Sequence, residues 1–351
     1  MTVFALDSLP HPIVQAPMAG GPSTAALAAA VGEAGGLGML AAGYRRPGAV
    51  AEEIATLRGL TRAPFGINLF APPAPAPDAE ALERYAERLT GEAERQAAEV
   101  GVPRHDDDGW AEKLAIVADA RVPVVSFTFG CPPAEAVAAL HDAGAAVWAT
   151  VTTPGEAVEA EAAGVDALIA QGVEAGGHRG SFDDGRPGDL GLLALLQLVA
   201  AAVELPLVAT GGLATGRSIA AVLAAGARAA QLGTVFMRTP EAATSPAQRA
   251  ALQEDAPTAL TRAFTGRTAR GIVNRFLAEH AGEAPAAYPD VHHLTAPLRA
   301  AARARGDAGA LNLWAGQAYP LATEEPAGDL VRRRAAEARD ALREAVARAA
   351  P

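Results

Sequence analysis

The chain has 351 residues, half of them hydrophobic, and a formal net charge of -11. This length fits one large domain or two smaller ones, and the apolar fraction is ample for a sizeable core. The acidic balance argues against a nucleic-acid partner, because phosphate backbones attract basic surfaces.

Three features bear on location. The single cysteine, Cys131, cannot form an intrachain disulfide and points to a reducing compartment. The N-terminal residues lack the basic and apolar regions of a signal peptide. The longest apolar stretch, residues 190–203, contains Gln197 and is too short to span a bilayer, so we expect a buried helix there. We therefore expect a cytoplasmic protein without a membrane partner.

Short apolar runs alternate with alanine-rich helical stretches, a pattern that predicts βα units and a parallel sheet. The eight predicted strands are residues 13–16, 37–42, 65–70, 123–129, 146–151, 166–170, 205–209 and 229–236. Eight units over about 240 residues fit a (β/α)8 TIM barrel. The alternative is a doubly wound open sheet, but the first turn, residues 16–22, lacks GxGxxG with a later acidic residue.

The sequence predicts two parts of unequal size. Residues 1–239 are expected to form an α/β barrel, with a helical insertion at about 72–120 that begins with a proline-rich loop, residues 72–77. Residues 240–351 are expected to form a smaller, mainly helical region that covers the active-site end. Its last stretch, residues 329–350, has the pattern of a polar amphipathic helix on the surface.

Lys113 is the only lysine of the chain, and it follows the acidic run Asp106–Asp108 at a predicted helix start. A barrel enzyme that works through a lysine Schiff base needs that lysine at a strand end. Schiff-base chemistry is therefore not expected.

A glycine-rich loop, residues 172–180, follows the sixth predicted strand and carries His178. Glycine lets the backbone take positive φ or approach a ligand closely, and no apolar periodicity would bury the histidine. One interpretation is a catalytic histidine in a ligand loop. The alternative is a tight strand-to-helix loop with an incidental surface histidine.

Two neighbouring units carry a pattern typical of a phosphate site. The seventh strand ends in Thr210-Gly211-Gly212, and the eighth carries Gln231-Leu232-Gly233-Thr234. Loops after these two strands commonly bind phosphate in TIM barrels, although glycine also serves plain packing there. Polar residues near strand ends accompany them: Gln15, Asn68, Ser126 and Gln171. Amide side chains both donate and accept, which suits the edge of a flavin ring.

Several motifs together resemble the nitronate monooxygenases, formerly called 2-nitropropane dioxygenases. They are Gln15 to Gly21, Phe65 to Phe70, Gly172 to Gly180 and Gln231 to Thr234. Ser126 to Gly130, Phe264 to Arg267, Arg270 to Phe276 and Trp314 to Gln317 resemble the class I members in particular. The resemblance covers nearly the whole chain.

The resemblance implies a barrel that binds FMN non-covalently and uses His178 as its catalytic residue. A metal site is not expected, because the sequence has no cysteine pair and no His-x-x-x-His motif. The implied FMN-binding residues are Ala16, Pro17, Met18, Asn68, Gln171, Gly176, Gly211, Gly212, Gln231, Leu232, Gly233 and Thr234. The implied reaction is oxidation of an alkyl nitronate, above all propionate 3-nitronate, by O2 to a carbonyl compound and nitrite or nitrate. Whether His178 acts as a base or as a stabilising charge stays open.

Two alternatives accompany this reading. One is an FMN-dependent reductase of the same fold that uses NAD(P)H on quinones or enoyl thioesters. The other is a barrel that binds a phosphate ligand without catalysis. Tyr288 and Tyr319 are candidates for the substrate side, with packing at turns as the favoured alternative. The adjacent His292 and His293 cannot share one face as metal ligands.

Overall fold

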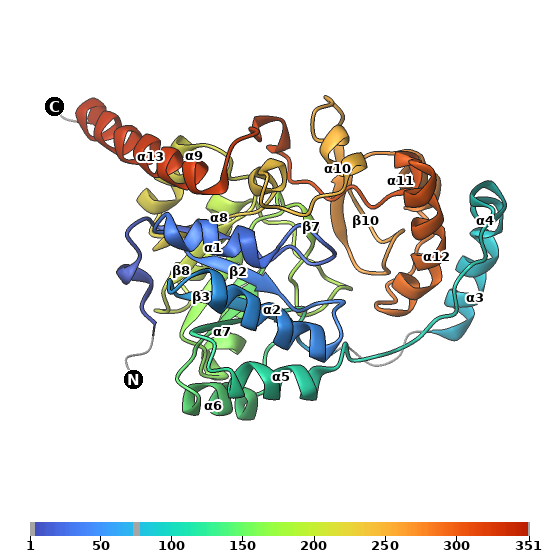
Figure 1. Ribbon diagram of the computed structural model, residues 1–351, viewed down its shortest axis with the longest axis horizontal. Coiled ribbons are helices and arrows are strands. Elements are labelled where there is room, and N and C mark those ends of the chain that lie inside the picture. The colour runs from blue at the N-terminus through green and yellow to red at the C-terminus, as the bar shows by residue number, and fades with distance from the viewer. Residues whose placement is uncertain (1–3, 73–77, 350–351) are drawn as a thin grey trace.

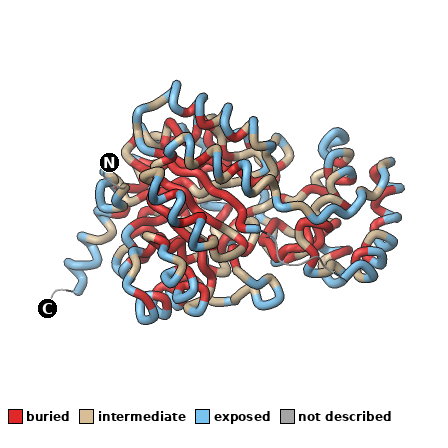
Figure 2. Tube along the Cα trace, turned by 90° about the horizontal axis from the view of Figure 1, so that it is seen from below, coloured by how far each residue is buried: buried red, intermediate tan, exposed pale blue. Residues whose placement is uncertain are grey.

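The computed structural model describes residues 4–72 and 78–349. Apart from Pro72, the predicted proline-rich loop lies outside the described residues. The described chain contains three hydrophobic clusters: a large one in and around a parallel barrel, a small one formed by barrel-strand residues such as Val14 and Trp148, and one in the C-terminal half (Figures 1 and 2).

The larger part is the predicted (β/α)8 barrel. Its parallel strands are β1 (Ile13–Gln15), β2 (Gly38–Ala41), β3 (Phe65–Phe70), β4 (Val124–Thr128), β5 (Ala146–Val151), β6 (Ala167–Gln171), β8 (Leu207–Thr210) and β9 (Ala229–Leu232). They pair in the order β1-β9-β8-β6-β5-β4-β3-β2, and a parallel bridge between Val14 and Leu37 connects the two ends. The fold class predicted from the sequence is confirmed.

The eight predicted strands are all present, with one clear difference in length. The last strand was predicted to reach residue 236 but ends at Leu232, and Thr234–Arg238 form a 3-10 helix, η2. Gly233 has φ -110 and ψ -80, so the backbone leaves the extended conformation at that residue. An apolar run can continue through a strand into a buried turn, and periodicity alone does not separate the two.

Helices α1 (Ala25–Glu33), α2 (Pro47–Leu60), α5 (Trp110–Asp119), α6 (Ala134–Asp142), α7 (Pro154–Ala162), α8 (Leu192–Ala200) and α9 (Gly216–Ala224) surround the barrel. The eighth position of the ring is filled by α13 (Ala327–Ala349), which packs against α9 and α1 (Figure 1). Leu330, Val331 and Ala335 of α13 are buried in the main core. Helix α13 therefore completes the ring of helices around the barrel.

Threonine caps fix where several ring helices begin. The side chains of Thr24, Thr153 and Thr215 each accept a hydrogen bond from the backbone N–H three residues later. Such caps satisfy a donor that the first helical turn leaves without an internal partner. They place each helix start directly after the loop that leaves a strand end.

The cluster in the C-terminal half joins the insertion to the C-terminal region. Helices α3 (Ala79–Arg88) and α4 (Thr90–Gln96) pack against α12 (Asp290–Arg305), near α10 (Pro246–Ala251) and α11 (Arg275–His280) (Figure 1). Leu82, Tyr85 and Leu89 share this core with Phe264 and Phe276. Of the predicted insertion, α5 instead occupies the ring position between β3 and β4.

A small antiparallel sheet was not foreseen in the predominantly helical C-terminal region. Strands β10 (Thr258–Thr261) and β11 (Ala269–Ile272) pair with each other, and β11 also pairs with β7 (Gly177–His178). Each strand has two to four residues, and β11 contains a charged arginine. Neither a continuous apolar run nor a clear alternation marks such strands in the sequence.

The predicted buried helix within residues 190–203 is α8, but it is buried on one face only. Leu195 and Leu196 are fully buried, whereas Leu193 and Leu198 are 51% and 47% exposed. Across the described ranges, no helix combines the length and the apolar character that crossing a membrane requires.

Candidate active site

A cavity of about 530 Å³ lies at the carboxyl ends of the barrel strands. Polar residues at or near the ends of six strands line it: Asn68, Thr128, Thr150, Gln171, Thr210 and Gln231. Residues of the C-terminal half close it from the other side, among them Thr244, Gln248, Thr265, Arg299 and Trp314. This end of a parallel barrel is where TIM-barrel enzymes have their active sites.

All predicted site residues except Leu232 line this cavity. They are Ala16, Pro17, Met18, Asn68, Gln171, Gly176, His178, Gly211, Gly212, Gln231, Gly233 and Thr234. Leu232 is 1% exposed and packs in the main core, while its carbonyl accepts a hydrogen bond from the Ala16 N–H. The structure thus brings together residues that are more than 200 positions apart in the chain.

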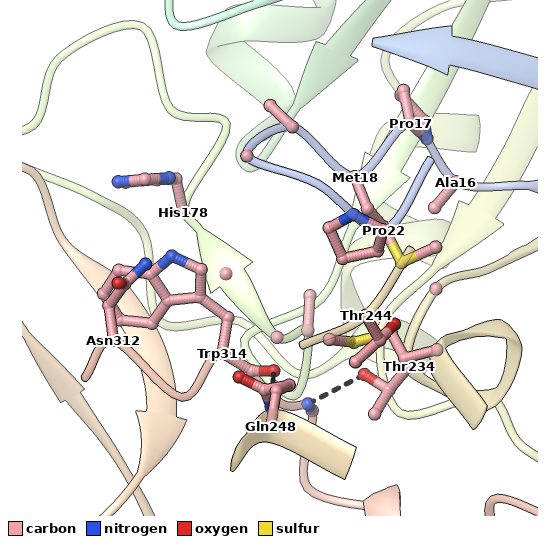
Figure 3. Close-up of a pocket in the computed structure, with 18 of the residues that line it drawn as sticks. Ala16, Pro17, Met18, Pro22, His178, Thr234, Thr244, Gln248, Asn312 and Trp314 are labelled. Atoms are coloured by element: carbon pink, nitrogen blue, oxygen red, sulfur yellow. Dashed lines mark hydrogen bonds between the residues drawn. The ribbon is translucent and has the colours of Figure 1, made fainter. Parts of the chain in front are cut away.

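Figure 3 shows the two sides of the cavity. His178 and Trp314 lie on one side, and Met18, Pro22 and Thr234 lie on the other. Thr234 accepts a hydrogen bond from the Gly316 N–H at 3.1 Å, which ties the segment after Trp314 to the end of the last barrel strand. The C-terminal segment is therefore a fixed wall of the cavity.

The glycine pair after β8 has the backbone geometry of a ligand loop. Gly211 and Gly212 have φ of 118° and 67°, a region that side chains with a Cβ rarely adopt. The nearby start of α9 is already occupied, because the Gly216 N–H donates to a Glu337 carboxylate oxygen at 3.1 Å. A phosphate here would therefore meet the loops at residues 211–214 and 233–235 rather than the first N–H of α9.

Three residues that line the cavity carry a buried side-chain oxygen without a hydrogen bond. Within the described part of the chain these oxygens are Gln231 Oε1, Thr244 Oγ1 and the Tyr44 hydroxyl. Gln231 and Thr244 lie near the proposed phosphate loops, whereas Tyr44 belongs to the loop after β2. Buried polar atoms are rarely left unpaired in proteins, and each one costs free energy. These atoms are what a bound polar cofactor would satisfy, so the cavity fits a ligand with hydrogen-bond donors near Gln231 and Thr244.

The amide of Asn68 is anchored by β4. Asn68 Nδ2 donates to the Ser126 carbonyl at 3.1 Å, to the Ser126 hydroxyl at 3.0 Å and to Thr128 Oγ1 at 3.0 Å. Ser126 itself is fully buried and serves this anchor, and Gln15 is likewise buried, with Ser23 and the Met39 N–H as partners. Neither Ser126 nor Gln15 lines the cavity.

The loop that carries His178 is held rigidly by Gln171 and Arg179. Gln171 Nε2 donates to the His178 carbonyl at 3.1 Å, and its Oε1 accepts from the Gly180 N–H at 2.9 Å. Arg179 is fully buried, and its guanidinium donates to the Gly172 carbonyl at 2.7 Å. Burial lowers the pKa of Arg179 to about 10, so it stays cationic at neutral pH. No motif in the sequence marks this arginine as part of the site.

Gly176 is required by protein packing. A Cβ at this position would lie 2.3 Å from the Gly316 nitrogen and 2.4 Å from the Ala315 carbonyl carbon. Gly180 is also packed closely, since a Cβ there would lie 2.5 Å from a Thr150 methyl. Close contact with the protein is enough to require glycine at both positions, and Gly176 also lines the cavity.

His178 lies among aromatic rings. The centroid of its imidazole is 5.4 Å from that of Trp314 and 5.5 Å from that of Phe129, in edge-to-face geometry. Its Nε2 lies 2.9 Å from Thr265 Oγ1. The Arg267 guanidinium lies over the Phe129 ring, with its central carbon 4.2 Å from the ring centre. Only the Thr265 hydroxyl gives the imidazole a polar partner in this set.

The surroundings of His178 keep it neutral. Burial, followed by the positive charges of Arg267 and Arg299, lowers the pKa of His178 to about 3. Burial disfavours the charged form of an imidazole, and nearby cations add to this effect. At neutral pH the ring is therefore an uncharged donor and acceptor, and the positive charge of the site belongs to the arginines.

A further wall was not identified from the sequence. Tyr44, His292 and Arg299 all line the cavity. The rings of Tyr44 and His292 are stacked, with centroids 4.4 Å apart and an angle of 4° between their planes. Arg299 Nη2 donates to the His292 carbonyl at 2.9 Å. These residues come from the loop after β2 and from α12, and no local motif links them in the sequence.

The remaining candidates from the sequence, Tyr288, Tyr319 and His293, differ in whether they reach the cavity. Tyr319 lines the cavity and is also packed, because its hydroxyl accepts from the Ala256 N–H at 2.8 Å. Tyr288 is not among the lining residues. His293 points to Asp106, with 3.0 Å between Nε2 and Oδ2.

One group of described side chains, Glu92, Glu279 and His280, has atoms close enough together to hold a metal ion. Arg275 already donates to both carboxylate oxygens of Glu92, and Arg95 lies 2.6 Å from Glu92 and 3.0 Å from Glu279. Two guanidinium groups supply the positive charge that a metal ion would bring. The group is therefore an ion-pair network that joins α4 to α11.

The fold and the cavity define an enzyme site of the TIM-barrel class. Residues 4–336 match the family model described as nitronate monooxygenase. The chain is 41% identical to a nitronate monooxygenase of Paraburkholderia phytofirmans, over 94% of this chain and 92% of that protein. It is 43% identical to a nitronate monooxygenase of Pseudomonas aeruginosa, over 93% and 96%.

Solved structures agree with this. A nitroalkane oxidase from Streptomyces ansochromogenes is 55% identical, with a TM-score of 0.93 over 97% of this chain and 99% of that one. FabK from Thermotoga maritima is 26% identical, with a TM-score of 0.74 over 98% and 97%. The chain belongs to the nitronate monooxygenase family, and it is an oxidoreductase.

Proposed function

We propose that the chain oxidises alkyl nitronates with O2 while FMN is bound in the cavity, and that propionate 3-nitronate is its substrate. The observation that carries this proposal is the place of His178, in one cavity with a glycine loop after β8 and with unpaired buried acceptors. Membership of the family supports the same reaction class.

The residues that would hold FMN follow from the cavity. The backbone at Gly211, Gly212 and residues 233–235 would hold the phosphate, and Gln231 would accept a hydrogen bond that it now lacks. Asn68 and Gln171, at the carboxyl ends of their strands, would lie against the polar edge of the ring system. When bound, FMN supplies the redox chemistry, since it can take electrons from a nitronate and pass them to O2.

His178 would act on the substrate as a neutral imidazole. A neutral ring can accept a proton from a nitroalkane carbon or donate a hydrogen bond to a nitronate oxygen. The negative charge of the nitronate would be met by Arg299, which lines the cavity, and at longer range by the buried Arg267. Of the two roles left open by the sequence, we therefore propose the base, which converts a bound nitroalkane into its nitronate, and not the imidazolium.

Oxygen uptake with propionate 3-nitronate by the purified, FMN-loaded protein tests the proposal. We expect uptake that depends on both the nitronate and FMN, with nitrite or nitrate formed. A yellow protein that consumes no oxygen with any nitronate would overturn it. A colourless protein that neither binds added FMN nor changes its spectrum would overturn the cofactor assignment.

The reductase alternative has a separate test. Anaerobic oxidation of NADH or NADPH by quinones or enoyl thioesters would be fast in a reductase and is expected to be slow here. The remaining alternative, a barrel without catalysis, is set aside by membership of an enzyme family. The cytoplasmic location, and the absence of nucleic-acid and membrane partners, stay predictions.

A further inference from the structure

The single lysine of the chain is buried beside the cavity, and the proposed reaction gives it no role. Lys113 is 2% exposed, and its Nζ lies 2.6 Å from Asp108 Oδ2 and 3.0 Å from the Ala42 carbonyl. A buried ammonium is costly unless it is paired and hydrogen-bonded, and here it is both. Lys113 thus contacts the loop after β2 directly, at Ala42, and is paired with Asp108, which contacts the same loop.

The aspartate of this pair reaches the backbone of a cavity residue. Asp108 Oδ1 accepts a hydrogen bond from the Tyr44 N–H at 3.0 Å. Tyr44 has φ of 64° and Asp108 has φ of 57°. Residues other than glycine adopt this left-handed region at a cost and keep it only where the surrounding contacts fix them. The Lys113–Asp108 pair supplies such contacts between two loops, because Asp108 accepts from the Tyr44 N–H and Lys113 donates to the Ala42 carbonyl.

The Tyr44 side chain transmits this fixation into the cavity. Its ring stacks on His292, and its edge meets Phe70 at a centroid distance of 5.3 Å. Gly43 makes room for this arrangement, since a Cβ there would lie 2.2 Å from the Phe70 ring. Tyr44, His292 and Phe70 all line the cavity. Their position limits how far a bound molecule can extend on this side.

We propose that Lys113 and Asp108 are positioning residues that hold Tyr44 against His292, and that this stack limits the chain length of the substrate. The inference rests on the proposed function, because the substrate is taken to be an alkyl nitronate. Asp108 and Lys113 do not line the cavity themselves, so they act through Tyr44 alone.

The test compares a short and a long substrate. For each variant, kcat/KM is measured with the nitronates of nitroethane and 1-nitropentane, together with the FMN content. Tyr44→Ala opens the wall directly, and we expect it to raise the long-to-short ratio roughly tenfold, the scale of methylene discrimination in a pocket. Asp108→Asn should also raise the long-to-short ratio, because it removes the Lys113–Asp108 ion pair that holds the loop at Tyr44.

A second variant covers the case in which Asp108→Asn leaves the buried Lys113 ammonium without an opposite charge and the protein fails to fold. The double variant Lys113→Met with Asp108→Leu removes both charges and the acceptor of the Tyr44 N–H, and leaves no buried unpaired charge. It too should raise the ratio. Unchanged ratios in the folded single or double variant, beside a raised ratio in Tyr44→Ala, would overturn the proposal.

Asp166→Asn is the matched control. Asp166 Oδ2 likewise accepts from a backbone N–H, that of Val147 at 2.7 Å, and pairs with a basic side chain, His141 at 2.9 Å. Val147 and Asp166 lie at the amino ends of β5 and β6, opposite the cavity, and His141 lies in the last turn of α6. The control is expected to keep the wild-type ratio even where its melting temperature falls, which separates positioning from general stability.

Binding separates this inference from the proposed function. Quenching of tryptophan fluorescence by nitroethane and 1-nitropentane reports affinity without turnover, because Trp314 lines the cavity. A wild-type protein that binds both compounds and oxidises neither nitronate would overturn the proposed function alone. The ratio of the two dissociation constants in the variants would still test the role of Lys113 and Asp108.

Discussion

His178 Nε2 lies 2.9 Å from Oγ1 of Thr265, and this contact joins the barrel loop to the C-terminal region. The Thr265 hydroxyl has an acceptor of its own, the Arg267 carbonyl at 3.3 Å. If the hydroxyl proton is directed there, the imidazole donates through Nε2 and keeps its free electron pair on Nδ1. In that tautomer Nδ1 can accept a proton, as the proposed base requires, and the contact that favours it joins two segments that are 87 residues apart.

Removing the Thr265 hydroxyl should weaken the proposed base without unloading FMN. Thr265→Val keeps the shape of the side chain but removes the partner of Nε2, a loss of about 1 kcal/mol or more. We expect kcat/KM with nitroalkanes to fall roughly tenfold. Thr265→Ser keeps the hydroxyl and should stay close to wild type, and an equal loss in both variants would contradict the orienting role.

Replacing the imidazole itself should affect the two substrate forms differently. His178→Asn removes the base, so turnover of nitroalkanes, which must lose a proton, should fall roughly 100-fold or more. Preformed nitronates need no base and should lose less. Steady-state kinetics with both forms, beside the visible spectrum of bound FMN, checks this expectation; unchanged nitroalkane turnover would remove His178 from the mechanism.

Acid should destabilise the fold through its neutral histidines. Burial lowers the pKa of His178 to about 3 and that of His292 to about 2, while an unfolded histidine titrates near 6.5. As the pH falls below about 6.5, the unfolded chain binds these protons first, so the free energy of unfolding decreases down to about pH 3. Melting temperatures between pH 7 and pH 5 measure the effect.

The control for this prediction is the His178→Asn variant. It lacks one of the two groups, so its melting temperature should fall less steeply over the same interval. A slope equal to that of the wild type would show that His178 does not enter the proton balance of unfolding.

Removing the unpaired acceptors Gln231 Oε1 and Thr244 Oγ1 should not destabilise the FMN-free protein but should weaken its binding of FMN. Thr244→Val removes the unpaired hydroxyl, and Gln231→Met removes the unpaired amide oxygen. Deleting a buried group that lacks a partner is close to neutral or stabilising, so the FMN-free variants should melt at or above the wild-type temperature. The dissociation constant for FMN should rise, by roughly tenfold for one lost hydrogen bond. Unchanged affinity in both variants would argue that FMN does not reach these atoms.

Gly176 should be intolerant of any side chain. A Cβ would lie within 2.4 Å of two backbone atoms of residues 315 and 316, which cannot move like a flexible side chain. We expect Gly176→Ala to lose about 1–3 kcal/mol of stability, the usual cost of overpacking. Gly59, on α2 with open space around it, is the control, and Gly59→Ala should gain up to about 1 kcal/mol. Chemical denaturation of both variants measures the difference.

The barrel was predictable because its signal is local. Each buried strand is a short apolar run between turns, and a βα alternation of that kind admits few folds. The positions of Gly211, Gly212 and His178 followed from the rule that strand ends converge on one face. The role of Gly176 did not, because the backbone that excludes a side chain there comes from residues 315 and 316.

The cavity wall formed by Tyr44 and His292 could not be predicted for a related reason. Tyr44 and His292 meet only in the folded protein, and no spacing or composition connects a loop after β2 with α12. Lys113 was noticed as the only lysine, but its partners, Asp108 and the Ala42 carbonyl, depend on how α5 packs beside β3. The strands β7, β10 and β11 could not be predicted because each is too short to show the alternation of apolar and polar residues that marks a strand.

The position of α13 has a consequence for how the protein is made. A ribosome releases the barrel strands long before Leu330 and Val331, which fill the gap between α1 and α9. Until then the nascent chain exposes the apolar flanks of both helices, and this is when it needs protection from aggregation. A chain cut short within α13 would therefore contain all eight barrel strands but leave the flanks of α1 and α9 uncovered.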